Sequence, residues 1–169
     1  LLSRGQRLHE LREHGVVLVD VQTGEQTVTR VNVVDHLAPD DAYDLVLVIM
    51  RKNHALRILP VLVANRGTPN VLFLMNNAAG PAALTDALGP ERVLIGFPNS
   101  AGYRQGYTVH CLTGTEDDKA HVPFGEVDGR ITERTREVAG ILGSAPGFGA
   151  EIRTDMDAWL KYHVALLFP

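Results

Sequence analysis

The chain has 169 residues, 45% of them hydrophobic and 21% charged, which is typical of one compact domain with a buried core and disfavours disorder or fibrous structure. A formal net charge of -4, without any run of Lys or Arg, disfavours a nucleic-acid partner. The single cysteine, Cys111, has no disulfide partner, no Cys/His spacing matches a metal site, and no apolar run reaches the roughly 18 residues that cross a bilayer, so we expect a cytoplasmic protein without metal or membrane partner.

The chain begins with a predicted helix and a predicted hairpin. Residues 6–14 have a helical pattern, and Gly15 ends it because glycine readily adopts the positive φ of a helix cap. Residues 16–21 and 26–31 then read as two strands on either side of Thr23-Gly24. This arrangement predicts an antiparallel hairpin.

The middle of the chain alternates apolar runs with helical patterns. Residues 45–50 are continuously apolar, which predicts a central parallel strand buried on both faces. A helical pattern covers residues 55–62, where Pro60 is expected to kink the helix or split it. Two further strands and the helix between them are predicted at residues 71–75, 93–97 and 81–88. The alternation predicts an α/β, Rossmann-like fold with a doubly wound, mainly parallel sheet.

The pattern changes after the last of these strands. Residues 108–112 and 122–126 read as strands, which we expect to pair with each other as antiparallel edge strands. Helices are predicted over residues 131–142 and 155–168. The apolar face of the second helix carries Trp159, Tyr162 and Leu166.

Polar residues follow each predicted parallel strand at its carboxyl end. Arg51 follows the run 45–50, Asn77 follows the run 71–75, and Arg4 follows Leu1-Leu2, which would be the last residues of an earlier strand. Ligands of open parallel sheets bind beyond this edge, because helix N-termini and loop amides converge there. We therefore expect the functional residues at this edge.

The residues after Leu1-Leu2 indicate which nicotinamide cofactor is bound. A carboxylate at this place accepts from the ribose of NAD, whereas an arginine pairs with the 2′-phosphate of NADP. Arg4 and Arg7 are present and residues 1–7 contain no acid, which favours NADP. The alternative is that both arginines are surface charges at the start of a helix.

Several separate segments, taken together and in this order, resemble the ketopantoate reductase family. The segments are Leu2-Ser3-Arg4-Gly5-Gln6-Arg7-Leu8, the strand leading to Arg51, Leu74-Met75-Asn76-Asn77-Ala78-Ala79-Gly80, Phe124-Gly125-Glu126-Val127-Asp128-Gly129 and Trp159-Leu160-Lys161. The match covers nearly the whole chain. The resemblance implies NADPH-dependent reduction of 2-dehydropantoate to pantoate, and hence a role in pantothenate biosynthesis.

The resemblance also implies a division into domains. Residues 1–153 would be part of an NADP-binding Rossmann-like domain, and residues 154–169 would start an all-helical second domain. The family's glycine-rich phosphate loop would lie before Leu1, and the chain has no initiating Met, so we expect both ends to be cuts through a longer protein. The fragment alone is expected to be inactive. The full-length protein is a candidate homodimer.

Three positions match the family's cofactor-binding residues. Arg4 matches the arginine that binds the 2′-phosphate. Gly80 matches the second glycine of the loop after the strand at 71–75, whereas Ala78 replaces the first. Arg51 stands where the family usually has a lysine, and Lys52 supplies the amine instead if the register shifts by one. Arginine keeps the positive charge but offers a planar fork in place of a compact ammonium.

Two positions match the family's catalytic residues. Asn77 matches an active-site asparagine that would hold the nicotinamide amide or the ketone oxygen, and the alternative is that it only caps the following helix. Lys161 matches the catalytic lysine, our predicted general acid, although a lone lysine on an amphipathic helix is commonly a solvated residue. The family's asparagine four residues later is replaced by Ala165.

Two other functions stay open at this point. The departures at Arg51, Ala78 and Ala165 fit a reductase of a related 2-oxo or hydroxy acid. A missing phosphate loop fits a non-catalytic NADP-binding module. Under either enzyme hypothesis, the expected partner is a small-molecule 2-oxo acid substrate. A serine hydrolase is rejected, because Ser100 lacks the flanking glycines of a nucleophile elbow.

Overall fold

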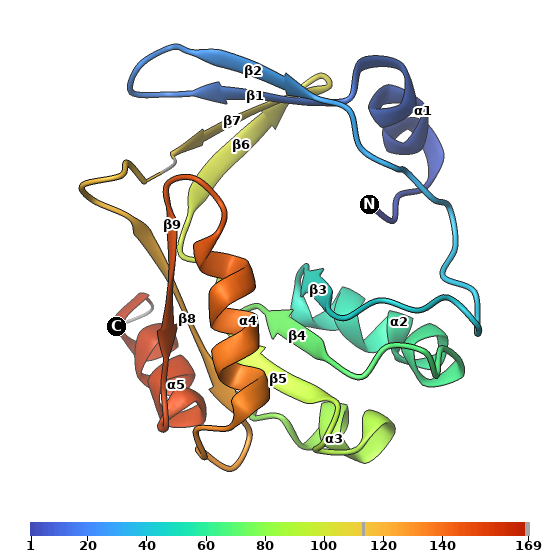
Figure 1. The fold of residues 1–169 in the computed structure, drawn as a ribbon, viewed down its shortest axis with the longest axis vertical. Helices are drawn as coiled ribbons and strands as arrows, with labels where there is room; N and C mark the ends of the chain where they lie inside the picture. The colour runs from blue at the N-terminus through green and yellow to red at the C-terminus, as the bar shows by residue number, and fades with distance from the viewer. Residues whose placement is uncertain (113, 168–169) are drawn as a thin grey trace.

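A computed structural model describes residues 1–112 and 114–167, which form two β-sheets and five helices (Figure 1). The helices are α1 (Gly5–His14), α2 (Lys52–Ala64), α3 (Ala82–Leu88), α4 (Glu133–Gly143) and α5 (Met156–Leu167). The five-stranded sheet has the order β3 (Val46–Ile49), β4 (Val71–Leu74), β5 (Val93–Gly96), β8 (Ala120–Glu126) and β9 (Phe148–Ile152). The four-stranded sheet has the order β2 (Gln26–Thr29), β1 (Val16–Asp20), β7 (Thr108–Leu112) and β6 (Ala101–Gln105).

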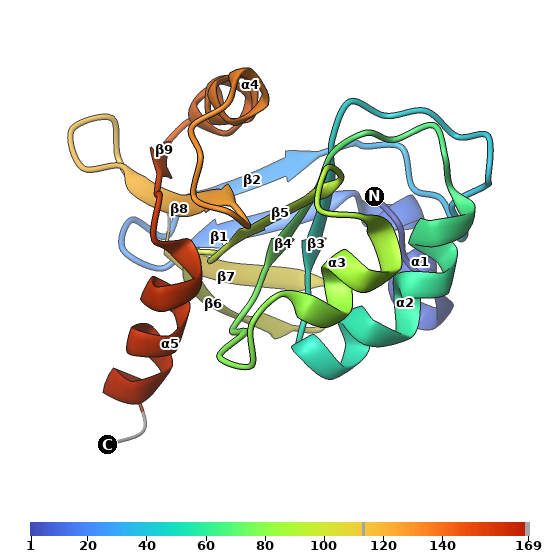
Figure 2. The same ribbon diagram turned by 90° about the horizontal axis from the view of Figure 1, so that it is seen from below.

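The five-stranded sheet carries the core of the molecule. Strands β3, β4 and β5 are parallel, β8 is antiparallel to β5, and every residue of β4 and β5 is buried. Alternate residues of β4 serve opposite faces: Phe73 packs in a cluster with α2, α3 and α5, whereas Leu72 packs in a second cluster with α4. Figure 2 shows α4 on one side of this sheet and α2, α3 and α5 on the opposite side. The predicted α/β fold with parallel central strands and antiparallel additions is confirmed.

The prediction of a central strand at residues 45–50 is wrong in its position. Strand β3 lies at the edge of the five-stranded sheet, and its residues Leu47 and Ile49 are 43% and 58% exposed. A continuous apolar run has the same pattern whether its strand has one neighbour or two, so the sequence does not distinguish the cases.

The helix that follows β3 is continuous through Pro60, so the expected split does not occur. Proline removes the backbone donor that would bond to the carbonyl four residues earlier, which here belongs to Leu56. Leu56 and Pro60 both lie on the exposed side of α2, where water can bond to that carbonyl. The exposed location explains why the helix tolerates the proline.

The four-stranded sheet confirms one strand pairing and corrects another. The antiparallel hairpin of β1 and β2 is present, and Gly15 before it has a φ of 78°, with no room for a Cβ next to the carbonyl oxygen of Thr29. The predicted pairing of residues 108–112 with residues 122–126 is wrong. Strand β7 pairs with β6 and, in parallel, with β1, whereas β8 pairs with β5 and β9. The competing partners β6 and β9 were not predicted.

Helix α5 packs its first turns on the five-stranded sheet. Met156 and Leu160 belong to the cluster around Phe73, while Tyr162 and Leu166 are exposed. The predicted end of this helix at Phe168 lies outside the described residues. Among the residues that the structure describes, no helix has the length and apolar character that a membrane span requires.

Candidate functional site

The turn between β4 and α3, residues 75–81, is called the Asn77 turn, and it holds a buried side-chain amide without a hydrogen-bond partner among the described residues. Asn77 is 2% exposed, and neither its Oδ1 nor its Nδ2 has a hydrogen-bond partner within the described residues. The backbone carbonyl oxygen of Asn77 accepts from the backbone N–H of Gly80 at 3.1 Å, and Gly80 has a φ of 79°. Buried amide groups are nearly always hydrogen-bonded, so this side chain has a free donor and a free acceptor that can bind a water or a ligand. The capping alternative is not supported, because no side-chain cap bond exists at α3.

Helix α5 brings Asp157 to the same turn, and Lys161 is the ion-pair partner of Asp157. The Lys161 Nζ donates to Asp157 Oδ2 at 2.5 Å, and the other carboxylate oxygen, Oδ1, is buried without a partner. A Cβ built on Gly80 would lie 3.5 Å from that Oδ1. The structure thus places Asp157, which the sequence analysis did not single out, against Gly80 in the turn that carries Asn77, and pairs Asp157 with Lys161.

Arg51 lies at the same edge of the sheet but is not in contact with this cluster. Strands β3 and β4 are parallel with Ile49 opposite Leu74, so Arg51 follows β3 just as Asn76 follows β4. Arg51 immediately precedes α2, is exposed, and makes no side-chain hydrogen bond or ion pair within the described part of the chain. Its guanidinium is available to an anionic ligand at this edge.

Arg4 lies beside α1, away from the five-stranded sheet (Figure 1). Its side chain is exposed, and its Nε donates to the carbonyl oxygen of Asp35 at 3.4 Å. Arg7 is engaged differently, since it donates to Glu10 and to the carbonyl oxygen of Tyr107. Arg7 is therefore a structural residue, while Arg4 keeps most of its donors free. No described contact brings Arg4 to Asn77 or Lys161.

Three aromatic rings fix helix α5 against the end of β5. The ring of Trp159 stacks on that of His163 at 4.9 Å between centroids, and the ring of Phe97, just after β5, lies 4.3 Å from that of His163. On α5, the rings of Trp159 and His163 lie on one side of the buried residues Met156 and Leu160. Asp157 and Lys161 lie on the other side. The rings thereby help to set the rotation of α5, and with it the side of the helix on which Asp157 and Lys161 lie.

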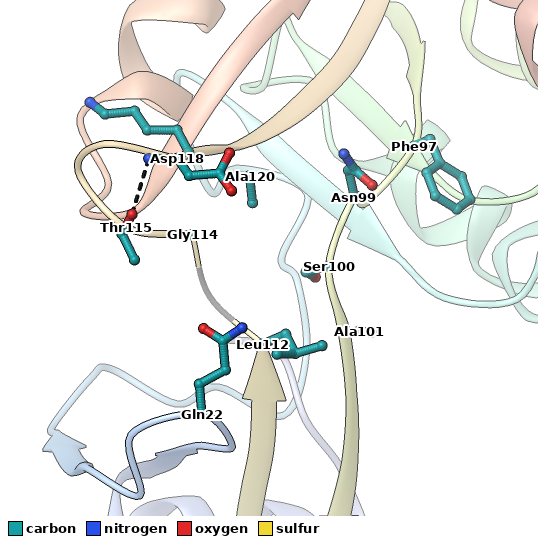
Figure 3. Close-up of a pocket in the computed structure, with 11 residues that line it drawn as sticks. Gln22, Phe97, Asn99, Ser100, Ala101, Leu112, Gly114, Thr115, Asp118 and Ala120 are labelled. Atoms are coloured by element: carbon teal, nitrogen blue, oxygen red, sulfur yellow. Dashed lines mark hydrogen bonds between the residues drawn. The ribbon is translucent and has the colours of Figure 1, made fainter.

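A cavity of about 440 Å³ lies elsewhere, between the two sheets (Figure 3). Polar residues line much of it, among them Gln22, Asn99, Ser100, Thr115 and Asp118. The backbone N–H of Asp118 donates to Thr115 Oγ1 at 3.0 Å. Among the residues that the structure describes, none of the predicted site residues lines this cavity, and no histidine lines it to activate Ser100.

A second cavity, of about 540 Å³, surrounds an ion pair with a structural role. Glu126 accepts from Arg134 and from Thr132 Oγ1, and Arg134 also donates to the backbone carbonyl of Glu91. Burial raises the pKa of the Glu126 carboxyl, but the hydrogen bonds from Arg134 and Thr132 outweigh it and leave the pKa below its ordinary value. Both groups are saturated by protein partners, so this cavity offers little to a ligand.

Comparison with solved structures shows the fold. A ketopantoate reductase of the PanE/ApbA family from Ralstonia eutropha JMP134 is similar with a TM-score of 0.76 and 16% identity, over 95% of this chain and 50% of that one. The 2-dehydropantoate 2-reductase from Geobacter metallireducens GS-15 gives 0.75 and 21%, over 98% and 53%. A D-mandelate dehydrogenase in a ternary structure with NADH and anilino(oxo)acetate gives 0.71 and 16%, over 94% and 49%.

The chain spans about half the length of these solved structures. No curated protein sequence matches it significantly. A family model described as ketopantoate reductase PanE/ApbA matches residues 1–128, which is more than half of the chain. The chain belongs to the ketopantoate reductase family.

Proposed function

We propose that this chain forms part of an NADPH-dependent reductase of a 2-oxo acid, with 2-dehydropantoate as substrate and pantoate as product in pantothenate biosynthesis. The observation that carries the proposal is the buried, unpartnered amide of Asn77, in a turn whose Gly80 lies against Asp157, the partner of Lys161, in a chain of this family. A buried donor and acceptor suit a ligand that is polar and contains a carbonyl group.

Lys161 acts as the general acid in this proposal. When bound, NADPH supplies the hydride that reduces the ketone. The resulting negative charge on the ketone oxygen is stabilised by the Lys161 ammonium, which then donates a proton to that oxygen and becomes a neutral amine. Asn77 holds the ketone oxygen or the nicotinamide amide, because its side chain offers both a donor and an acceptor.

Cofactor binding is assigned to Arg4, Arg51, Asn77 and Gly80. Arg4 has most of its donors free and would pair with the 2′-phosphate of NADP, and the free guanidinium of Arg51 would hold an anionic group at the edge of the sheet. Gly80 leaves the turn without a side chain, so a ligand can approach its backbone. The domain boundary between residues 153 and 154, the cytoplasmic location and the homodimer remain predictions.

A related 2-oxo acid is the second candidate substrate. Arg51, Ala78 and Ala165 depart from the family pattern, which would change how the far end of the substrate is held. The similarity to a D-mandelate dehydrogenase supports a substrate range wider than ketopantoate.

The test is NADPH oxidation by the complete gene product with a panel of 2-oxo acids. We expect the highest kcat/KM with 2-dehydropantoate, and a loss of roughly 100-fold or more in kcat for Lys161→Ala, since general acid catalysis contributes that much. Lys119→Ala, which removes the lysine paired with the exposed Glu116 in the loop before β8, is the control and keeps full activity. Preference for another 2-oxo acid would favour the second candidate, and NADPH binding without any turnover would favour a non-catalytic module.

A further inference from the structure

The carboxylate of Asp157 lies between the helix that carries Lys161 and the turn that carries Asn77. We propose that Asp157 is a positioning residue: it holds the Lys161 ammonium at the Asn77 turn, in the place from which the proton is donated. The inference rests on the proposed role of Lys161 as the general acid, and it adds a residue to which no role has been assigned.

The first support is the contact between the two side chains. Asp157 and Lys161 are one helical turn apart on α5, and Lys161 Nζ lies 2.5 Å from Asp157 Oδ2. The Lys161 side chain is 52% exposed, so without a partner its four-carbon stem would sample many rotamers. A carboxylate four residues earlier restricts the ammonium to one region.

The second support is the direction in which the carboxylate faces. Asp157 Oδ1 is buried, has no hydrogen-bond partner within the described residues, and lies 3.5 Å from where a Cβ of Gly80 would be. An ordinary surface pair keeps both carboxylate oxygens in water. In Asp157, Oδ2 accepts a hydrogen bond from Lys161. The other oxygen, Oδ1, faces Gly80 of the Asn77 turn and has lost its hydration.

A second lysine pair in the chain shows what an ordinary surface pair looks like. Lys119 Nζ lies 3.6 Å from Glu116 Oε2, and the Glu116 side chain is 76% exposed. Asp157 differs from Glu116 in its shorter contact, its lower exposure and its position against a turn with other unpartnered polar groups. The contrast separates a positioning role from a simple surface ion pair.

The activity test compares two substitutions of Asp157 in the complete gene product. Asp157→Asn removes the charge at nearly constant shape, and we expect kcat to fall roughly 10- to 100-fold with KM for the 2-oxo acid changed far less, because misplacing a catalytic group by about 1 Å costs that much. Asp157→Glu keeps the charge and restores most of kcat. The control Glu116→Gln leaves both constants unchanged. Wild-type kcat in Asp157→Asn would overturn the proposal.

A second readout does not depend on turnover. The readout is ¹³C-methylated lysine NMR of the complete gene product, with the signals of Lys161 and Lys119 assigned from Lys161→Ala and Lys119→Ala. We expect Asp157→Asn to move the Lys161 signal and leave the Lys119 signal in place, with the reverse for Glu116→Gln. An unmoved Lys161 signal would overturn the positioning role. If the wild type fails to reduce any 2-oxo acid while the Lys161 signal does move, the reductase proposal fails and the positioning of Lys161 stands.

Discussion

The two sheets of this protein differ in how their strands are stabilised. In the five-stranded sheet, β4 and β5 are buried in every residue and helices cover both faces. In the four-stranded sheet, β2 and β6 are exposed in every residue, and side-chain stacking helps to hold the sheet, as between Tyr103 and His110 at 4.8 Å. The Asn77 turn follows β4 of the first sheet, so the proposed site stands on the rigid part of the molecule.

The largest expected difference between the sheets is the response to removal of a side chain. Phe73 of β4 is 1% exposed in the core, and Phe73→Ala should lower the free energy of unfolding by about 3–5 kcal/mol. Val28 of β2 is 54% exposed, and Val28→Ala should change it by no more than about 0.5 kcal/mol. Urea unfolding monitored by circular dichroism measures both. Equal losses would show that the two sheets do not differ in this way.

A somewhat smaller effect is expected at the end of β8, where the five-stranded sheet is anchored to α4. Glu126→Gln removes one partner of the buried pair with Arg134 and should cost about 3 kcal/mol at neutral pH. Glu116→Gln, at the exposed pair with Lys119, is the control and should leave the unfolding free energy unchanged.

The same pair gives a pH dependence with a defined sign. The pKa of Glu126 is lower in the folded chain than in the unfolded chain, so its contribution is complete above roughly pH 4.3 and is lost as the pH falls through the folded pKa. Acid unfolding should therefore be less steep in Glu126→Gln than in the wild type. Identical profiles would assign the acid sensitivity to other groups.

The smallest expected effect is on the helix that covers the five-stranded sheet. Gly140 is exposed within α4, and a Cβ there meets nothing within 4 Å, so Gly140→Ala should stabilise the fold by about 0.5–1 kcal/mol. Gly96→Ala in β5 should destabilise it, because a Cβ there would lie 2.7 Å from the carbonyl oxygen of Pro123. Thermal unfolding gives both signs, and stabilisation by both changes would contradict the tight packing between β5 and β8.

The sequence predicts the five-stranded sheet better than the four-stranded one for a physical reason. Strands β4 and β5 are short, wholly apolar runs, which few structures other than buried strands can accommodate. Strands β6 and β9, with the sequences AGYRQ and FGAEI, contain glycine and charge and are strands because of their neighbours. The same neighbours decide that β7 pairs with β6 and not with β8.

The site shows a similar limit. Asn77, Gly80 and Lys161 were predicted from a resemblance, and the structure places Gly80 against Asp157, the ion-pair partner of Lys161. Asp157 was missed because a carboxylate four residues before a lysine is common on helices, and its buried oxygen becomes visible only when α5 is placed against the Asn77 turn.

The central claim is that NADPH binds at the edge of the sheet where α5 meets the Asn77 turn. Trp159, the only tryptophan of the chain, lies on α5 next to this edge, and reduced nicotinamide absorbs where tryptophan emits. Titration of the complete gene product with NADPH should quench Trp159 emission and excite nicotinamide emission, and Trp159→Phe should remove that transfer. Saturable NADPH binding with no energy transfer from Trp159 would place the cofactor elsewhere and contradict the claim.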